Sequence, residues 1–185
     1  MLKNIKESIG RQLLKGEMSA VQRQRKASGM EEALTIGILF DASETEDYEL
    51  VRKYVNYLKE LKKKPKAIGF FSTKEIPQTT YAKLEFDYFS HKDVMWNGKP
   101  TGVAISNFIN EEYDILIDLN IYDRFPLHYI AACSRARFKV GKRAPGTDAF
   151  LDMTIESGGE KGLKFLLRNI DTYLTMLNKK EKPGP

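Results

Sequence analysis

The sequence predicts an α/β fold: an open, mainly parallel sheet of about five strands flanked by helices, in flavodoxin-like or half-Rossmann order. Two observations support this prediction. Residues 114–120, Asp-Ile-Leu-Ile-Asp-Leu-Asn, form an apolar run between polar ends, which is typical of a strand buried on both faces. Segments with helical spacing alternate with other apolar runs along the chain, as expected where helical crossovers join parallel strands.

The individual elements follow from the same patterns. Strands are expected at 34–40, 67–72, 114–120, 136–141 and 149–155, with a short extended piece at 85–89. Helices are expected at 2–24, 45–64, 102–109, 126–134 and 160–177. The second helix has acidic residues in its first turn and lysines in its last, which suits the helix dipole, and Pro65 stops it. Gly158 and Gly159 separate the last strand from the last helix.

The N-terminal residues differ in charge from the rest of the chain. Residues 1–26 hold seven Lys or Arg against two acidic residues, so they account for the whole net charge of +5. We predict a basic amphipathic helical arm and link at 1–29, an α/β domain at 30–178 and a disordered tail at 179–185. Leu2, Ile5, Ile9 and Leu13 form a stripe expected to dock on the domain or on a second copy of the chain. The expected outward cations are Arg11, Lys15, Arg23, Arg25 and Lys26.

Several classes of protein are disfavoured by composition. No apolar run reaches the length of a membrane span, and we expect a cytoplasmic protein. The single cysteine, Cys133, has no partner for an internal disulfide and is interpreted as a small buried residue. No metal site is expected, because the two histidines have no cysteine partners for a structural zinc site. No cofactor is expected, because the first strand is followed by neither a Gly-x-Gly-x-x-Gly motif nor a P-loop.

Ligands of doubly wound sheets bind beyond the carboxyl ends of strands, at the switch point of the strand order. Two loops qualify here, one after the first strand and one after residues 114–120. The candidate catalytic residues in and near them are Asp41, Asp118, Asp123 and His128. The candidate ligand-binding residues in them are Ser43, Asn120, Tyr122 and Arg124. We expect Asp118→Asn to lower stability more than activity, because a carboxylate near the end of a buried strand should accept backbone hydrogen bonds.

A run of cations extends beyond the second loop, and no acidic residue lies between Asp123 and Asp148. Its further members, also candidate ligand-binding residues, are Arg135, Arg137, Lys139, Lys142 and Arg143. Alternation places Arg135, Arg137 and Lys139 on one strand face. Two interpretations stay open: an edge strand whose cations prevent aggregation, and a site for an anion or an acidic partner.

Residues 113–119, the helix at 126–134 and the strand at 136–141 resemble the central strand, helix and Arg-rich strand of heptosyltransferase-type glycosyltransferases, in their N-terminal half. The resemblance implies a fold; that family's Gly-Asp after the first strand corresponds to Glu46-Asp47 here, without the glycine. Residues 134–141 also resemble an uncharacterised bacterial family of single-domain proteins, which implies no known activity. Residues 114–120 are similar to the phospho-acceptor strand of response-regulator receivers, but Ala42 replaces the second acid that a magnesium site needs.

The sequence therefore favours a non-catalytic interaction or ligand-binding module that uses the basic arm and the Arg-rich segment. One alternative is an enzyme acting on a small anionic, phosphate- or sugar-containing substrate at the switch point. Another is a protein that associates with nucleic acid through the arm. The candidate partners are an acidic protein, a small anion, nucleic acid, or a second copy of the chain bound through the N-terminal helix.

Overall fold

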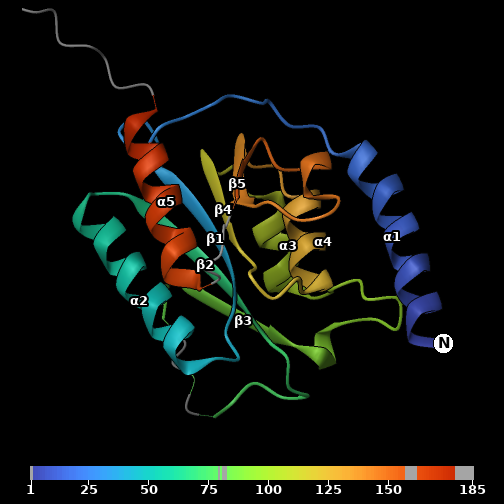
Figure 1. Ribbon diagram of the computed structural model, residues 1–185. Helices are drawn as coiled ribbons and strands as arrows, with labels where there is room; N and C mark the ends of the chain where they lie inside the picture. Colours follow the sequence, from blue (N-terminus) through green and yellow to red (C-terminus); the bar gives the residue numbers. More distant parts are fainter. Residues whose placement is uncertain (1, 79, 81–82, 157–161, 178–185) are drawn as a thin grey trace, which may run out of the picture.

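The computed structural model describes residues 2–78, 80, 83–156 and 162–177, with side chains from residue 8 onward. In this part of the chain, six parallel strands form one open sheet in the order β3-β2-β1-β4-β5-β6 (Figure 1). The strands are β1 Thr35–Asp41, β2 Lys64–Phe71, β3 Phe86–Ser90, β4 Ile115–Leu119, β5 Phe138–Lys142 and β6 Met153–Ile155. This is the Rossmann order, which decides between the two topologies that the sequence left open. The switch point lies between β1 and β4.

The prediction of an α/β fold with a parallel sheet is confirmed, but the number of strands was wrong. The short extended piece at 85–89 is a full strand, β3, which pairs in parallel with β2 at one edge of the sheet. The strand predicted at 149–155 is shorter than expected, since Thr147–Ala149 form a 3₁₀ turn and only Met153–Ile155 pair with β5. Both strands lie at the outer edges of the sheet, where a strand pairs with one neighbour. Such a strand needs a less apolar sequence than a central strand, so its sequence pattern is weaker.

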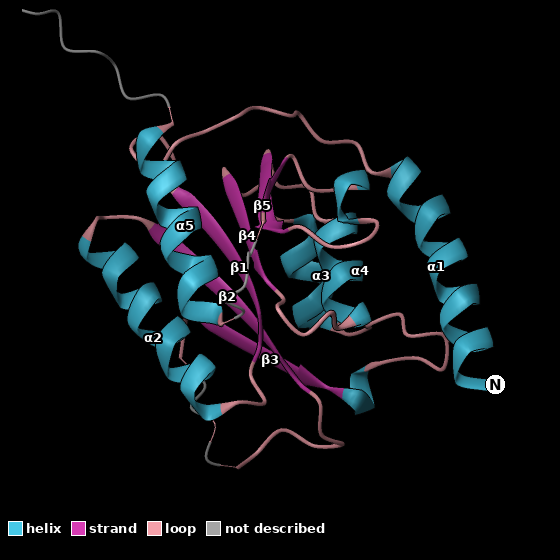
Figure 2. Ribbon diagram, viewed as in Figure 1, coloured by secondary structure: helices cyan, strands magenta, loops and turns pink. Residues whose placement is uncertain are grey.

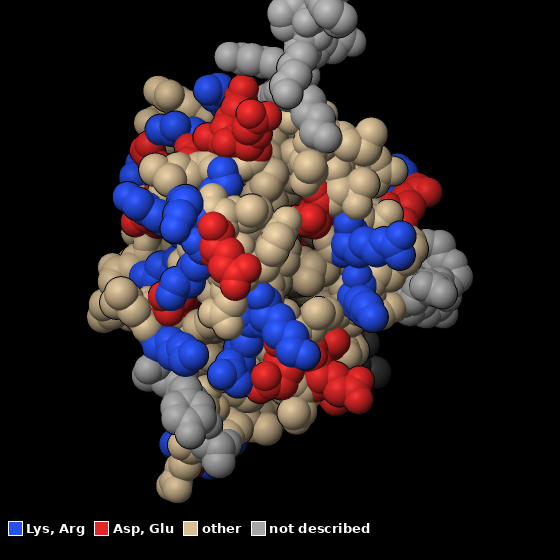
Figure 3. Space-filling model, turned by 90° about the vertical axis from the view of Figure 1, so that its left-hand side faces the viewer, with Lys and Arg blue, Asp and Glu red and all other residues tan. Residues whose placement is uncertain are grey.

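Of the five α-helices in the described residues, four cover the two faces of the sheet and α1 lies outside them. The helices are α1 Leu2–Ala20, α2 Thr45–Glu60, α3 Val103–Asn110, α4 Phe125–Cys133 and α5 Leu163–Met176. Helices α2 and α5 pack on one face, and α3 and α4 on the other (Figure 2). Lys, Arg, Asp and Glu are interspersed over the outer surface of α2 and α5 (Figure 3). No helix in the described part of the chain is long and apolar enough to span a membrane.

Helix α1 adds a further layer outside α4. All nine residues of α4 are buried. A helix that is apolar on nearly every side is stable in water only where neighbouring elements surround it. Leu14, Met18 and Val21 of the N-terminal segment supply part of that cover. At Gly10 the helix approaches closely: a Cβ atom there would lie 2.0 Å from the carbonyl oxygen of Asn97. Glu17 fixes the contact by accepting hydrogen bonds from the Tyr129 hydroxyl and from Lys99.

The docking face of α1 differs from the one that the sequence indicated. Of the predicted stripe, Ile9 and Leu13 are 41% and 48% exposed, and the side chains of Leu2 and Ile5 lie outside the described residues. Arg23, expected to point outward, is buried and bound to Asp152. After α1 the chain crosses over the amino ends of the strands toward α5 (Figure 1), where the Met30 N–H donates to the Leu174 carbonyl. The predicted tail at 179–185 and the Gly158-Gly159 break lie outside the described residues.

Candidate functional site

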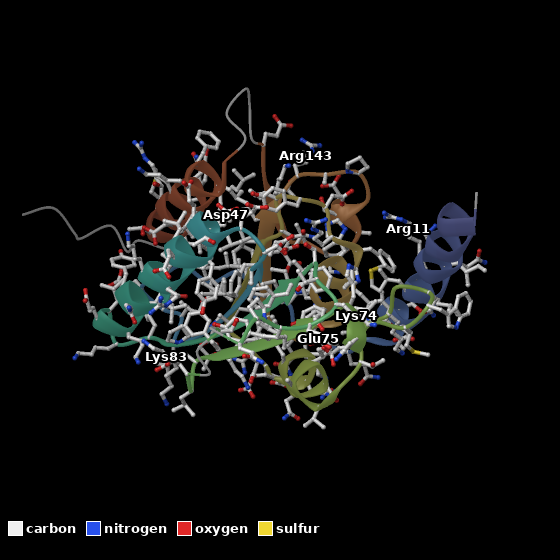
Figure 4. All side chains as sticks on the ribbon, turned by 90° about the horizontal axis from the view of Figure 1, so that it is seen from below. Arg11, Asp47, Lys74, Glu75, Lys83 and Arg143 are labelled. Carbon is white, nitrogen blue, oxygen red and sulfur yellow. The ribbon has the colours of Figure 1, made fainter. Side chains whose placement is uncertain are left out.

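The carboxyl ends of β1 and β4 place two acidic side chains at the switch point. Asp41 ends β1, and Asp118 is the penultimate residue of β4, with Leu39 of β1 as its register partner. Both residues are buried, at 3% exposure each. Figure 4 looks onto this carboxyl edge, with Asp47 of α2 and Arg143, which follows β5, around it. The fold thus brings together the two loops that the sequence singled out.

Asp41 is fully engaged by its neighbours. One carboxylate oxygen, Oδ1, accepts the Ser43 backbone N–H at 2.9 Å, and the other, Oδ2, accepts the Arg124 Nε–H at 2.5 Å. Arg124 remains 37% exposed at its side chain. The ion pair neutralises Asp41 and ties the loop after β1 to the loop after β4.

Asn120 holds the second loop in shape. Its Oδ1 accepts the Arg124 backbone N–H at 2.8 Å, and its Nδ2 donates to the Arg124 carbonyl at 3.0 Å. Between them, Asp123 has a φ of 55°, in the left-handed region that non-glycine residues seldom adopt. Tyr122 donates from its hydroxyl to Asp47 at 2.7 Å, and the Arg124 guanidinium lies 5.7 Å from the Tyr122 ring centroid. Such backbone strain at a strand end is common at binding sites.

Asp118 contrasts with Asp41 because it has little support. Its side chain accepts one hydrogen bond among the described residues, from the Asn120 backbone N–H at 3.1 Å. Burial raises the pKa of Asp118 to about 7, and the negative charge of Asp123 adds to the shift. At neutral pH this carboxyl group is therefore divided between its acid and its base forms.

His128, in the first turns of α4, joins the same group of residues. Its Nε2 lies 3.3 Å from Oδ1 of Asp123, another of the candidate catalytic residues. Burial lowers the pKa of His128, Asp123 opposes that shift, and Arg11 of α1 reinforces it. Arg11 reaches α4 from α1, with its guanidinium 5.3 Å from the Phe125 ring centroid (Figure 4). The lowered pKa favours the neutral imidazole at neutral pH.

A pocket of about 290 Å³ adjoins this edge between α2 and the loop that follows β2. Ser43 lines it, and the Ser43 and Ser72 hydroxyls are hydrogen-bonded to each other at 2.8 Å. The sequence analysis missed Tyr48 and Arg52, which also line it. Their spacing of four residues on α2 places them on one helix face, which was the available signal. The other lining residues are Ala42, Thr45, Glu49, Phe71, Pro77 and Thr80.

Residues 6–177 match the model of DUF6913, a family of unknown function. The chain belongs to this family. No curated protein and no solved structure matches the chain.

The Arg-rich segment of this DUF6913 chain does not form one continuous surface. Strand β5 lies between β4 and β6, so the edge-strand interpretation was wrong. Arg135 and Arg137 precede β5 at the amino edge, and Lys139 is buried inside it at 1% exposure. Arg137 is paired with Asp114 and Glu112, and Arg143 with Glu156. Lys142 donates to the Ile121 carbonyl at 3.2 Å.

Metal ligands do not gather at the switch point. Among the described residues, no group of three or more His, Cys, Asp or Glu is placed to hold a metal ion. Cys133 is buried at the end of α4, and burial raises the pKa of its thiol to about 11. The thiol is thus protonated at neutral pH, as expected of a structural cysteine.

Proposed function

We propose that this chain is a ligand-binding module whose ligand lies at the switch point, against Asp118 and the loop from Asn120 to Arg124. Asp118 supports the proposal most strongly. Burying a carboxyl group with one hydrogen bond is costly, and among the described residues no ion pair compensates Asp118 for it. Strongly shifted acids in such positions are candidates for contact with a ligand.

The charges of the site favour a small, uncharged, hydroxyl-rich ligand. Arg124 is occupied by Asp41, and Glu46 and Asp47 lie in the first turn of α2, where they repel a phosphate. Carboxyl and amide groups bind hydroxyls well, and the Tyr122 ring, 42% exposed, offers a face for stacking. The proposal therefore differs from the anionic substrate considered from the sequence. The basic arm and the Arg-rich segment support binding less, since Arg23 and Lys139 are buried.

Catalysis at the same place is a second candidate, favoured by one specific observation. A carboxyl group with a pKa near 7 exchanges protons readily at neutral pH, as a general acid or base must. The His128–Asp123 pair lies on the same edge. In this alternative Asp118 would exchange the proton.

Other expectations from the sequence stay predictions. These are a bacterial origin, a cytoplasmic location, self-association through α1, an acidic-protein or nucleic-acid partner, and the likeness to heptosyltransferase-type glycosyltransferases. Asp47, the residue that corresponds to that family's acid, accepts a hydrogen bond from the Tyr122 hydroxyl at the rim of the site.

Thermal-shift and calorimetric titrations with glucose, myo-inositol and adenosine, each beside its phosphorylated counterpart, test the proposal. We expect at least one uncharged compound to bind more tightly than its phosphate, and Asp118→Asn to weaken that binding about tenfold. Asp171→Asn is the matched control, because Asp171 is a half-buried acid on α5, bonded to Tyr54. Equal binding by wild type and the Asp118 variant would refute the site. Preference for the phosphates would refute the ligand class.

A further inference from the structure

A second cavity lies near the amino ends of the strands, away from the switch point. It measures about 110 Å³ and lies where the end of α1 and the following link meet α4 and β5. Its lining is rich in cations, with Arg23, Arg25 and Lys139 contributing. The remaining lining residues are Met18, Val21, Ala132, Ala149 and Phe150.

Lys139 has one hydrogen-bond donor to spare. Its Nζ donates to the Ala131 carbonyl at 2.7 Å and to the Ala132 carbonyl at 3.0 Å, at the carboxyl end of α4. An ammonium group carries three N–H bonds, and within the described residues the third has no acceptor. A buried donor without a partner is costly, so an acceptor in the cavity would stabilise it.

Positive charge exceeds negative charge around this cavity. Asp152 is the one acid that the structure places against the three cations among the described residues. Both of its carboxylate oxygens accept from Arg23 at 2.7 Å, and Oδ2 also accepts the Lys139 backbone N–H at 2.9 Å. Arg25 Nε lies 3.8 Å from Asp152 Oδ1, and the Arg25 side chain is 70% exposed. Burial and the charge of Arg23 lower the pKa of Lys139 to about 7, with Asp152 and Cys133 opposing and Arg25 reinforcing the shift.

We propose that this cavity binds a small inorganic oxyanion of the size of phosphate or sulfate, held by the third N–H of Lys139 and the guanidinium of Arg25. The volume is that of roughly three to four water molecules, which admits a tetrahedral oxyanion but not a nucleotide. The anion supplies the missing acceptor and offsets the excess positive charge. Because Arg23 and Arg25 belong to the link after α1 and Lys139 to β5, the anion fastens the N-terminal segment to the sheet.

The test uses the full chain at constant ionic strength, with sodium sulfate or sodium phosphate replacing sodium chloride. We expect saturable binding by calorimetry and a rise in melting temperature for wild type. Lys139→Met and Arg25→Gln should each weaken binding about tenfold or more. Arg135→Gln is the matched control, because it removes an exposed cation outside the cavity. Arg25→Gln keeps the test decisive if Lys139→Met folds poorly, since Arg25 is mostly exposed.

Two results would overturn the proposal: no effect of either oxyanion beyond that of chloride, or equal effects in wild type and all three variants. A pH series with sulfate sharpens the test, because sulfate does not titrate between pH 6 and 9. Binding should weaken as the pH rises above about 7 and Lys139 loses its proton.

Discussion

Asp118 and Lys139 lie on the neighbouring strands β4 and β5, and burial shifts the pKa of each to about 7 from opposite sides. Their surroundings differ. The ammonium of Lys139 donates to two carbonyls at the carboxyl end of α4, where the helix dipole favours a cation. Within the described part of the chain, Asp118 accepts a single hydrogen bond, from the Asn120 backbone N–H at the carboxyl ends of the strands. Burial is the largest cause of both shifts, with a like charge adding to each, Asp123 for Asp118 and Arg23 for Lys139. The hydrogen bonds around each group decide whether its charged form stabilises the fold.

Different parts of the chain cover the sheet at the carboxyl ends and at the amino ends of its strands. The carboxyl edge is shaped by the short loop from Asn120 to Arg124, which follows β4 directly. The amino edge near Lys139 is closed by residues more than a hundred positions earlier, through Arg23 and its pair with Asp152. Changes in the N-terminal segment should therefore reach Lys139 and leave Asp118 unaffected.

The largest expected effect comes from deleting residues 1–26. The sequence predicted a separate domain at 30–178, which would fold without the arm, but the structure leads us to expect the reverse. Leu14 is buried against α4, Met18 and Val21 are partly buried there, and a fully buried large apolar side chain contributes about 1.5–3 kcal/mol. Their combined loss, together with that of the Arg23–Asp152 pair, is a large fraction of the stability of a typical domain, which is roughly 5–15 kcal/mol. Circular dichroism and size-exclusion chromatography should show an expanded or aggregated chain; cooperative unfolding at the wild-type temperature would contradict this.

A smaller effect is predicted for Asp118→Asn. The structure leads us to expect a gain in stability, whereas the sequence led us to expect a loss. The pKa of Asp118 is raised by folding, so the folded state holds a proton that the unfolded state releases between about pH 4 and pH 7. As the pH rises through that range, Asp118 therefore lowers the free energy of unfolding of the wild type. The variant does not lose this stability, because asparagine does not titrate. At pH 8 the variant should be more stable by up to about 4 kcal/mol, since each pKa unit is worth about 1.4 kcal/mol. Denaturant unfolding at pH 5 and pH 8 measures it; a less stable variant at pH 8 would show that the charged form is supported.

The smallest effect is expected for Lys139→Met. The pKa of Lys139 is lowered by folding, so between about pH 7 and pH 10 the unfolded state holds the extra proton and wild-type stability rises. Between pH 7 and pH 9 the wild type should gain about 2 kcal/mol of stability that the variant does not gain. At pH 7 the two proteins should be about equally stable, because the variant loses the Lys139 hydrogen bonds but no longer buries a charge. Unfolding curves at the two pH values test this. An unchanged pH dependence would mean that Lys139 stays charged throughout.

Local patterns anticipated much of the switch-point site. Asp41, Asp118 and Asn120 were found because each stands at the end of an apolar run, and a parallel sheet brings such ends together at one edge. The link between Arg124 and Asp41 was not predictable, because the two residues are 83 positions apart. Tyr48 and Arg52 were missed for the same reason: their pocket exists only where α2 meets the loop after β2.

The sequence by itself determined the α/β class and the central strands, since hydrophobic period and turn residues are local signals. The tertiary structure alone decided the strand order, the short edge strand β3 and the face by which α1 docks. A helix with apolar residues on two sides can dock by either, and the choice of Gly10 and Leu14 over Ile9 and Leu13 depends on how closely α1 approaches Asn97 and Phe125. The tertiary structure also decided that the side chains of Arg23 and Lys139 are buried and that Arg135 is exposed. A cation is buried only where distant segments bring carboxylates or carbonyls to it.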